Sequence, residues 1–346
     1  MSNKANVDNR QAGPDVVRSV ACLLVVALHF YLNCGYYNEP LVGHRMFIMT
    51  CCRWLFVAAV PLFFMLTGYF MQNKVVSAQY YKGIIPLAVS YIVISAGKMI
   101  LYNRLYGKVY PFGEMLKNIG NYQIAWYMGM YLCLYLLIPF LNRMWKALDD
   151  KEKNILIGTM IFLCGIYPIF KYVAPMFFVG IYPVMYYFIG TAIRERQYRI
   201  NRWLLLGIAV VVSIIEAVIS FTFTSVEVFD WNVISTADGT YGTLLMCITG
   251  VCIFLAFYQV DVRSKLLKRL FAAISSVSFE IYLFAGAYDA VIYLYLKRSV
   301  NGANEFFWWF FVTVPASFTA AFISAVVYKH VVMAIGKLFG KISIKR

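Results

Sequence analysis

Apolar and polar positions follow one another in long blocks along this 346-residue chain. Apolar runs of about twenty residues recur from one end to the other, a length that crosses a bilayer as a helix. The pattern predicts an all-α polytopic bundle of about ten transmembrane spans. We place them at 16–37, 53–72, 84–102, 124–142, 154–171, 177–193, 203–224, 240–258, 273–296 and 306–332.

The cations between these runs fall mainly on alternate sides. With a cytoplasmic N-terminus, 22 Lys and Arg residues lie in cytoplasmic segments and eight on the opposite side. The positive-inside rule therefore favours an even number of spans and cytoplasmic termini. The loop at 225–239 is acidic and lacks cations, so we place it outside. We expect a polar cytoplasmic tail at 1–14, a single transmembrane domain at 15–334 and a basic cytoplasmic tail at 335–346.

The composition limits the classes of partner and cofactor that we expect for this protein. The chain is 62% hydrophobic and 14% charged, so its net charge of +15 indicates membrane topology, with the lipid bilayer as partner and no nucleic acid. Its eight cysteines fall mostly within apolar runs. Because they show no metal-ligand spacing, we expect neither a disulfide framework nor a metal site. We interpret the first apolar run as a retained helix and not a signal peptide.

The first span carries three polar residues on one stripe. Arg18 and His29 are eleven residues apart, so in a helix they lie within roughly 20° of each other and about 16 Å apart along the axis. Asp15 falls on the same stripe. Polar groups inside a membrane tend to face the bundle interior or a wet cavity, which favours a working site. The alternative is a buried histidine hydrogen-bonded to a neighbouring helix.

Two further motifs accompany this D-x-x-R-x(10)-H stripe. PLFFMLTGYF, at 61–70, is similar to a P-x-F-F-x-x-S-G-Y signature with Thr67 in place of Ser, and AWYMG, at 125–129, opens a helix that closes at Pro139. Together the three features resemble the acyltransferase-three family of bacterial integral membrane O-acyltransferases. A fourth segment, 275–289, resembles another family motif, but Ala285 stands at the usual histidine position.

This resemblance implies transfer of an acyl group, usually acetyl, from cytoplasmic acyl-CoA to a hydroxyl of a cell-envelope or exported carbohydrate. Acyl-CoA is then a donor substrate, no cofactor is bound, and the protein lies in the cytoplasmic membrane. The family residue most associated with catalysis matches His29, and the family arginine matches Arg18. Lys82 stands where relatives usually have an arginine-rich approach to a proline.

The chemistry of the side chains agrees with this assignment. Acyl transfer needs a base near neutral pH, which imidazole supplies, and cations that hold the donor phosphates. Asp15 is placed to orient Arg18. Glu280 or Asp289 could replace the missing second imidazole, although pairing with Lys98 is an equal alternative. We therefore assign His29, Asp15 and Glu280 to the catalytic group, and Arg18, Lys82, Tyr69, Trp126 and Tyr282 to substrate and acyl-CoA binding.

Each aromatic assignment has a structural alternative. Thr67 and Gly68 favour close helix packing, with Tyr69 lining a cavity as the functional alternative. Trp126 and Tyr127 open their helix near an interface, where an aromatic-belt role competes with substrate contact.

Two other functions remain open at this point. A transporter or flippase for a small or lipid-linked solute would suit the helix broken by Pro168, Pro175 and Pro183, although no inverted repeat is visible. The departures from the family motifs would also permit a relative that has no catalytic activity and acts as a binding partner in an envelope assembly. The acceptor sugar, the acyl chain and homo-oligomer formation are not fixed by the sequence.

Overall fold

The computed structural model describes residues 11–107, 111–122, 125–165, 176–224, 228–229 and 240–339. Over these residues the chain is helical, and the one extended pairing is an isolated antiparallel bridge between Pro40 and Val228. The expected all-α fold is therefore confirmed. The predictions for Pro168 and Pro175, and most of the acidic loop at 225–239, lie outside the described residues.

Each of the ten expected spans contains a helix. In chain order the helices are α2 (Gly13–Asn33), α3 (Gly43–Val57), α4 (Ala59–Met71), α5 (Ala78–Lys82), α6 (Ile85–Tyr106), α7 (Phe112–Gly120), α8 (Trp126–Ala147), α9 (Asp150–Gly165), α10 (Tyr182–Arg196), α11 (Arg202–Phe223), α12 (Leu244–Phe257), α13 (Lys265–Ser276), α14 (Ser278–Leu296), α15 (Ala303–Phe306) and α16 (Phe310–Phe339). Six helical segments in the described part are long and apolar enough to cross a membrane: α2, α3–α4, α5–α6, α11, α14 and α15–α16. The count of ten stays a prediction for α8, α9, α10 and α12.

One expected boundary differs clearly from the structure. The span placed at 53–72 is the second part of a longer helical segment that begins at Gly43 and breaks at Ala58. Pro61 lies in the first turn of α4 and has no N–H to donate, so a break in the helix just before it costs little.

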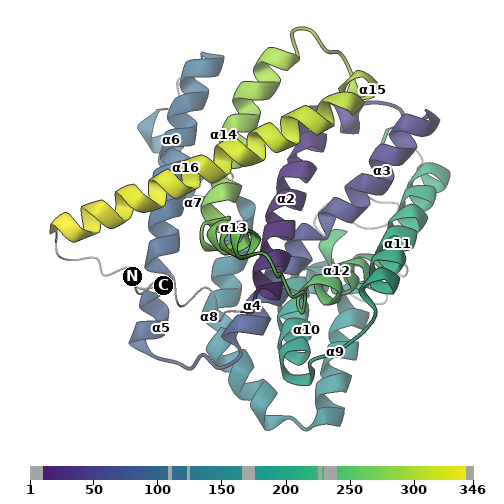
Figure 1. Cartoon of the computed structure of the whole chain (residues 1–346), viewed down its shortest axis with the longest axis vertical. Coiled ribbons are helices and arrows are strands. Elements are labelled where there is room, and N and C mark those ends of the chain that lie inside the picture. Colours follow the sequence, from purple (N-terminus) through teal and green to yellow (C-terminus); the bar gives the residue numbers. More distant parts are fainter. Residues whose placement is uncertain are drawn as a thin grey trace.

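Helix α2 lies at the centre of the bundle. It packs against α3, α4, α12, α13, α14 and α16, and Figure 1 shows α16 crossing obliquely in front of α2 and α14. Most of its side chains are buried, including Val17, Val26 and Phe30. A helix that is apolar nearly all round is expected at such a central position.

Helices α4 and α10 approach each other through two glycines. A Cβ atom at Gly68 would lie 2.0 Å from the carbonyl oxygen of Tyr187, and one at Gly190 would lie 2.0 Å from that of Met65. Thr191 Oγ1 also donates across the contact to the carbonyl of Gly68. The packing interpretation of the Thr-Gly motif is confirmed for Gly68, while Thr67 itself bonds within its own helix, to Phe63.

A tyrosine pair satisfies the backbone carbonyl that Pro139 leaves without a helical donor in α8. Pro139 cannot donate to the carbonyl of Tyr135, and that carbonyl instead accepts from the Tyr80 hydroxyl at 2.5 Å. Tyr135 returns an equal bond, from its hydroxyl to the carbonyl of Tyr80, and the two rings stack with centroids 4.5 Å apart. The pair fixes α5 against α8.

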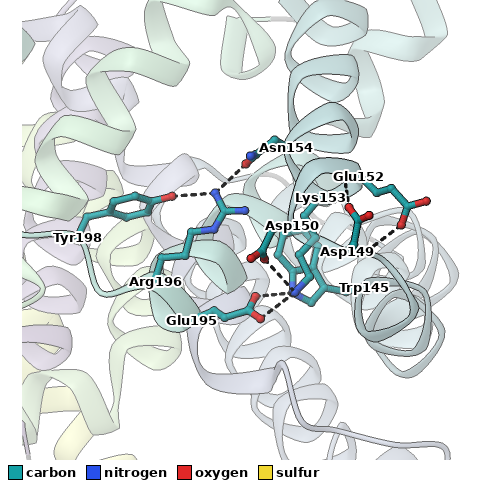
Figure 2. Close-up of polar contacts among 9 residues, drawn as sticks. All are labelled: Trp145, Asp149, Asp150, Glu152, Lys153, Asn154, Glu195, Arg196 and Tyr198. Carbon is teal, nitrogen blue, oxygen red and sulfur yellow. Dashed lines mark hydrogen bonds and ion pairs between the residues drawn. The ribbon is translucent and has the colours of Figure 1, made fainter.

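Polar contacts join the ends of α8, α9 and α10 (Figure 2). Lys153 Nζ lies 2.8 Å from Glu195 Oε1, and Trp145 Nε1 donates to Glu195 Oε2 at 3.0 Å. Asp149 and Glu152 exchange side-chain to backbone bonds of 2.8 Å, the reciprocal arrangement of a capping box at the start of α9.

The start of α2 lies at the same end of the bundle. Gly13 packs on the backbone of Tyr258, and the Tyr258 hydroxyl donates to the carbonyl of Tyr198, just after α10. This end, which also holds Arg194, Arg196 and Lys268, is called the basic end below.

Candidate functional site

A single cavity of about 510 Å³ borders both Arg18 and His29. That volume falls in the range of about 300–1,000 Å³ found for small-molecule sites. The cavity extends from the Arg18 turn of α2, toward the basic end, to Tyr37 and Arg53 beyond the other end of α2. It is lined by Arg18, Val25, Leu28, His29, Leu32, Tyr37, Arg53, Val57, Val60, Phe63, Leu66, Thr67, Leu87, Trp126, Tyr127, Tyr131, Thr240, Tyr241, Ser275, Ser278, Phe279 and Tyr282.

His29 is held by a carboxylate from α14. Its Nδ1 lies 3.2 Å from Asp289 Oδ2, and Ser317 Oγ of α16 donates to Asp289 Oδ1 at 2.7 Å. The Asp289 side chain is 6% exposed and that of His29 is 19% exposed. A carboxylate that accepts the Nδ1 proton selects the tautomer with a free Nε2. With Nδ1 directed at Asp289, the ring nitrogen left for a ligand in the cavity is Nε2.

Lys98 brings a positive charge near the same carboxylate from α6. Its amino group occupies the space where a side chain at Gly286 would begin, 2.4 Å from an ideal Cβ. Gly286 precedes Asp289 by three residues, and Lys98 interacts electrostatically with Asp289. The cation compensates part of the charge of a carboxylate that lies in an apolar bundle. Lys98 does not border the described cavity, so it acts on the site only through Asp289.

Contacts with α13 and α4 help to fix Arg18 at its end of the cavity. Its Nη1 donates to Ser275 Oγ of α13 at 3.1 Å, and its guanidinium lies over the Phe70 ring, 5.2 Å from the centroid. Ser275 and Ser278 border the cavity beside it. This end therefore presents a positioned cation and two hydroxyls.

Aromatic rings form much of the wall between Arg18 and Arg53. Trp126 stacks on Tyr241 with centroids 5.3 Å apart and an interplanar angle of 26°. The Tyr282 ring packs beside the imidazole of His29, 6.1 Å between centroids, and Tyr127 meets Tyr282 edge to face. Flat apolar walls with a few fixed polar groups are typical of sites for small polar ligands.

The structure brings together four of the eight site residues predicted from the sequence. Arg18, His29, Trp126 and Tyr282 border one cavity, as their spacing and motifs indicated. Asp15 belongs to the same stripe, but its side chain is buried (3% exposed) and does not border the described cavity. A role of Asp15 in orienting Arg18 stays a prediction.

The other three predicted residues point elsewhere. Tyr69 lies in the last turn of α4, where Arg194 Nη1 of α10 donates to its hydroxyl at 2.9 Å. It borders a separate pocket with Gly13 and Tyr258. Lys82 is exposed at the end of the short helix α5. Glu280 accepts from Ser90 Oγ at 3.1 Å and so turns toward α6. None of the three borders the His29 cavity in the described part of the chain.

The predicted site did not include Arg53 and Tyr37, and Asp289 was named only as an alternative to Glu280. Asp289 follows Ala285 by four residues, so both lie on one face of α14, and Asp289 provides the polar group that Ala285 lacks. Glu280 and Asp289 were equal candidates from the sequence, and this spacing is the signal that could have favoured Asp289. Arg53 stands at the expected start of a span, where a cation is typical of a loop, so nothing in the apolar pattern indicated that it lies in the interior.

Comparison with known proteins assigns the family. A family model described as an acyltransferase domain matches residues 11–326, which include all the described helices from α2 to α14 and most of α16. No curated protein and no solved structure matches the chain. The matched segment contains the whole cavity, His29 and Asp289. This chain belongs to the acyltransferase-3 family of membrane acyltransferases.

Proposed function

We propose that this protein is an O-acyltransferase of the cytoplasmic membrane that moves an acyl group, in the first place acetyl, from cytoplasmic acyl-CoA to a hydroxyl of a cell-envelope or exported carbohydrate. The observation that supports it most is the placement of His29, bonded to Asp289 and bordering one cavity that also borders a cation on either side. Family membership supplies the reaction class. The donor, the acceptor and the membrane are parts of the proposal.

His29 is the base in this reaction. Its Nε2 takes the proton of the acceptor hydroxyl while that oxygen attacks the thioester carbonyl, and the resulting imidazolium returns the proton to the departing CoA sulfur. The C–S bond breaks as the C–O bond forms, so the step needs no oxidant or reductant. Asp289 does not meet the reacting atoms and is a positioning residue, since its bond to Nδ1 keeps Nε2 in the accepting form.

Arg18 receives the donor. The cavity reaches Arg18 in the second turn of α2, near the basic end, and the positive-inside rule favours a cytoplasmic location for that end. The rise along α2 between Arg18 and His29 is about 16 Å, a length that an extended pantetheine arm can bridge. Arg18 then contacts the phosphate region of the donor while the thioester reaches His29.

A transporter remains the alternative from another class. It would move its solute through the cavity without breaking a bond, and it would have no need of a histidine held in one tautomer. The His29–Asp289 contact is therefore the feature that favours the enzyme.

The deciding experiment measures cleavage of the acetyl-CoA thioester and transfer of its acetyl group. Purified protein in lipid vesicles is given acetyl-CoA labelled in the acetyl group, with and without a panel of bacterial envelope glycans, and free CoA thiol and labelled carbohydrate are measured. We expect thiol release that requires His29, slow with water alone and faster with a competent glycan, together with label in that glycan. Intact acetyl-CoA under all conditions, at the level of protein-free vesicles, would overturn the proposal.

A further inference from the structure

A second cavity lies at the side of the bundle, between α6, α14 and α16. It has a volume of about 400 Å³, and its lining includes Gly97 and Lys98 of α6, Phe284 and Tyr288 of α14 and Tyr328 of α16. We call it the Lys98 groove. Figure 1 shows α16 crossing obliquely over α14, which also packs against α6. All three helices belong to segments that are long and apolar enough to cross a membrane, and Gly97 is exposed, so the groove opens toward lipid.

Lys98 is the one charged residue in the described lining of this groove. The other described lining residues are apolar or aromatic. Lys98 stands near the middle of α6, so its charge lies deep in the membrane-spanning part of the chain. A charge at that depth is expensive, and such residues normally pair with an opposite charge or serve a ligand.

The ammonium of Lys98 has three donors, yet it makes no hydrogen bond and no direct ion pair with any described residue. Its nearest described partners are the Tyr102 ring, 5.5 Å from the centroid, and Asp289, with which it interacts only electrostatically. The Asp289 oxygens are engaged by His29 and Ser317 instead. The Lys98 side chain is half-buried, and its nitrogen is not fully enclosed by the protein. Its donors are therefore open to an acceptor that the described residues do not supply.

The groove limits what that acceptor can be. A carboxylate carries one charge, which one ammonium balances through charge-assisted hydrogen bonds that are strong in a low dielectric. A phosphate carries more charge and needs more donors than the described lining offers. The lining of α6 from Val93 to Leu101 is otherwise apolar over about 12 Å, a surface that suits a hydrocarbon chain. The Tyr328 hydroxyl is buried without a partner in the described part, a second polar group left unsatisfied at this groove.

We propose that the Lys98 groove binds a medium-chain fatty acid, with the carboxylate on the Lys98 ammonium and the hydrocarbon chain along α6, between α14 and α16. None of the lining residues of this groove borders the cavity of His29. The inference therefore does not rest on the proposed function. It gives the protein a second class of ligand, a carboxylic acid dissolved in the bilayer.

The test is competition for a photoreactive decanoate, because simple partition into lipid does not saturate. Protein in phosphatidylcholine nanodiscs is irradiated with decanoate that carries a diazirine on its chain, in the presence of increasing decanoate or decanol. Labelled peptides are identified by mass spectrometry. We expect saturable labelling of peptides from α6, α14 and α16, displaced by decanoate at about a tenfold lower concentration than by decanol, the effect of one charge-assisted hydrogen bond. Labelling that does not saturate, or equal displacement by the two competitors, would overturn the inference.

Two variants assign the binding to the groove. Lys98→Met keeps an unbranched apolar side chain without the ammonium and should abolish the preference for decanoate over decanol. Arg104→Met is the matched control, since Arg104 is an exposed cation on the same helix that does not border the groove. Gly97→Leu should lower the saturable labelling severalfold with Lys98 in place, because no atom lies within 4 Å of a Cβ added at Gly97 and the new side chain fills the groove.

A thermal melt checks that each variant is folded. An undiminished preference for decanoate in a folded Lys98→Met protein, or undiminished labelling in a folded Gly97→Leu protein, would contradict the proposal. Should Lys98→Met fail to fold, Gly97→Leu decides alone. None of these measurements uses acetyl-CoA, so failure of the groove and failure of the acyltransferase proposal are separate results.

Discussion

His29 Nδ1 on α2 lies 3.2 Å from Asp289 Oδ2 on α14, although the two residues are 260 positions apart in the chain. The contact matters for the proposed chemistry, because it engages Nδ1 and leaves Nε2 as the nitrogen that would take a proton from an acceptor hydroxyl. A histidine bonded only to a backbone carbonyl would gain orientation without the stabilising charge. The pair gives an intramembrane imidazole the chemistry of a base.

Replacing Asp289 by Asn should impair the reaction more than it impairs the fold. The amide keeps the shape but no longer stabilises the protonated imidazole or fixes its tautomer, so the acyl-transfer rate should fall by about two to four orders of magnitude. Ser317→Ala is the matched control, since it removes a neighbouring bond to the same carboxylate and should have a much smaller effect. The measurement is the initial rate of thiol release at saturating acetyl-CoA. An Asp289→Asn rate equal to that of Ser317→Ala would show that the carboxylate is structural only.

Replacing Arg18 by Gln should weaken binding of the acyl-CoA donor. The side chain is anchored to Ser275 and faces the cavity, so its loss removes one charge-assisted contact and should raise the KM for acetyl-CoA roughly ten- to a hundredfold, with a smaller change in kcat. Lys265→Gln, on the exposed start of α13, removes a charge from the neighbouring helix without a cavity contact and serves as control. An unchanged KM in the Arg18 variant would place the donor elsewhere.

Replacing Gly68 by Ala should force α4 and α10 apart. The added Cβ would stand 2.0 Å from the carbonyl oxygen of Tyr187, which is backbone and cannot rotate away. Overpacking of this kind costs about 1–3 kcal/mol, occasionally more, and should lower the thermal unfolding midpoint in detergent. Gly97→Ala in α6, with no atom within 4 Å of the new Cβ, is the control and should unfold near the wild-type temperature. Equal midpoints for the two variants would contradict this account of the α4–α10 contact.

The contact of Glu195 with Lys153 and Trp145 should make stability depend on pH. Partial burial alone would raise the pKa of Glu195, but the bonds from Lys153 and Trp145 and the nearby charges of Lys153 and Arg196 outweigh it, so the pKa lies below the ordinary 4.5. Glu195 stands beyond the expected span at 177–193, at the basic end. Because the folded pKa is the lower one, the carboxylate stabilises the fold above about pH 4.5, and this stabilisation is lost as pH falls through the folded pKa.

The unfolding midpoint of the wild type should therefore drop more steeply on acidification than that of Glu195→Gln. Asp150→Asn is the control, since Asp150 is 87% exposed and lies 3.9 Å from the same lysine. Parallel acid curves for the wild type and Glu195→Gln would argue against the contact.

The sequence predicted the helices well because each apolar run must satisfy its own backbone hydrogen bonds in a membrane. It also predicted that Arg18 and His29 share a site, since eleven residues is a whole number of helical turns to within about 20°. It could not say which helix faces His29. Periodicity fixes the faces of one helix, whereas the partner of a face depends on packing between segments distant in the chain.

The predicted residues that do not border the cavity illustrate the same limit. Tyr69 and Lys82 were assigned to the site from their motifs, yet α4 turns Tyr69 toward Arg194, and α5 ends with Lys82 exposed. Arg53 differs from its prediction in the opposite way: it was expected at the edge of a span and lies in the interior. A cation at the edge of an apolar run is typical of a loop, but α3 begins ten residues earlier, at Gly43, and carries Arg53 into the interior.

The central claim, that the imidazole of His29 carries the acyl transfer, is tested most directly by the acetyl-CoA thiol-release rate of a folded His29→Gln protein. His330→Gln, at an exposed position on α16, is its control. We predict that the control keeps the wild-type rate while His29→Gln loses about two to four orders of magnitude, with an unchanged unfolding midpoint. A folded His29→Gln protein that releases thiol at the wild-type rate would contradict the account.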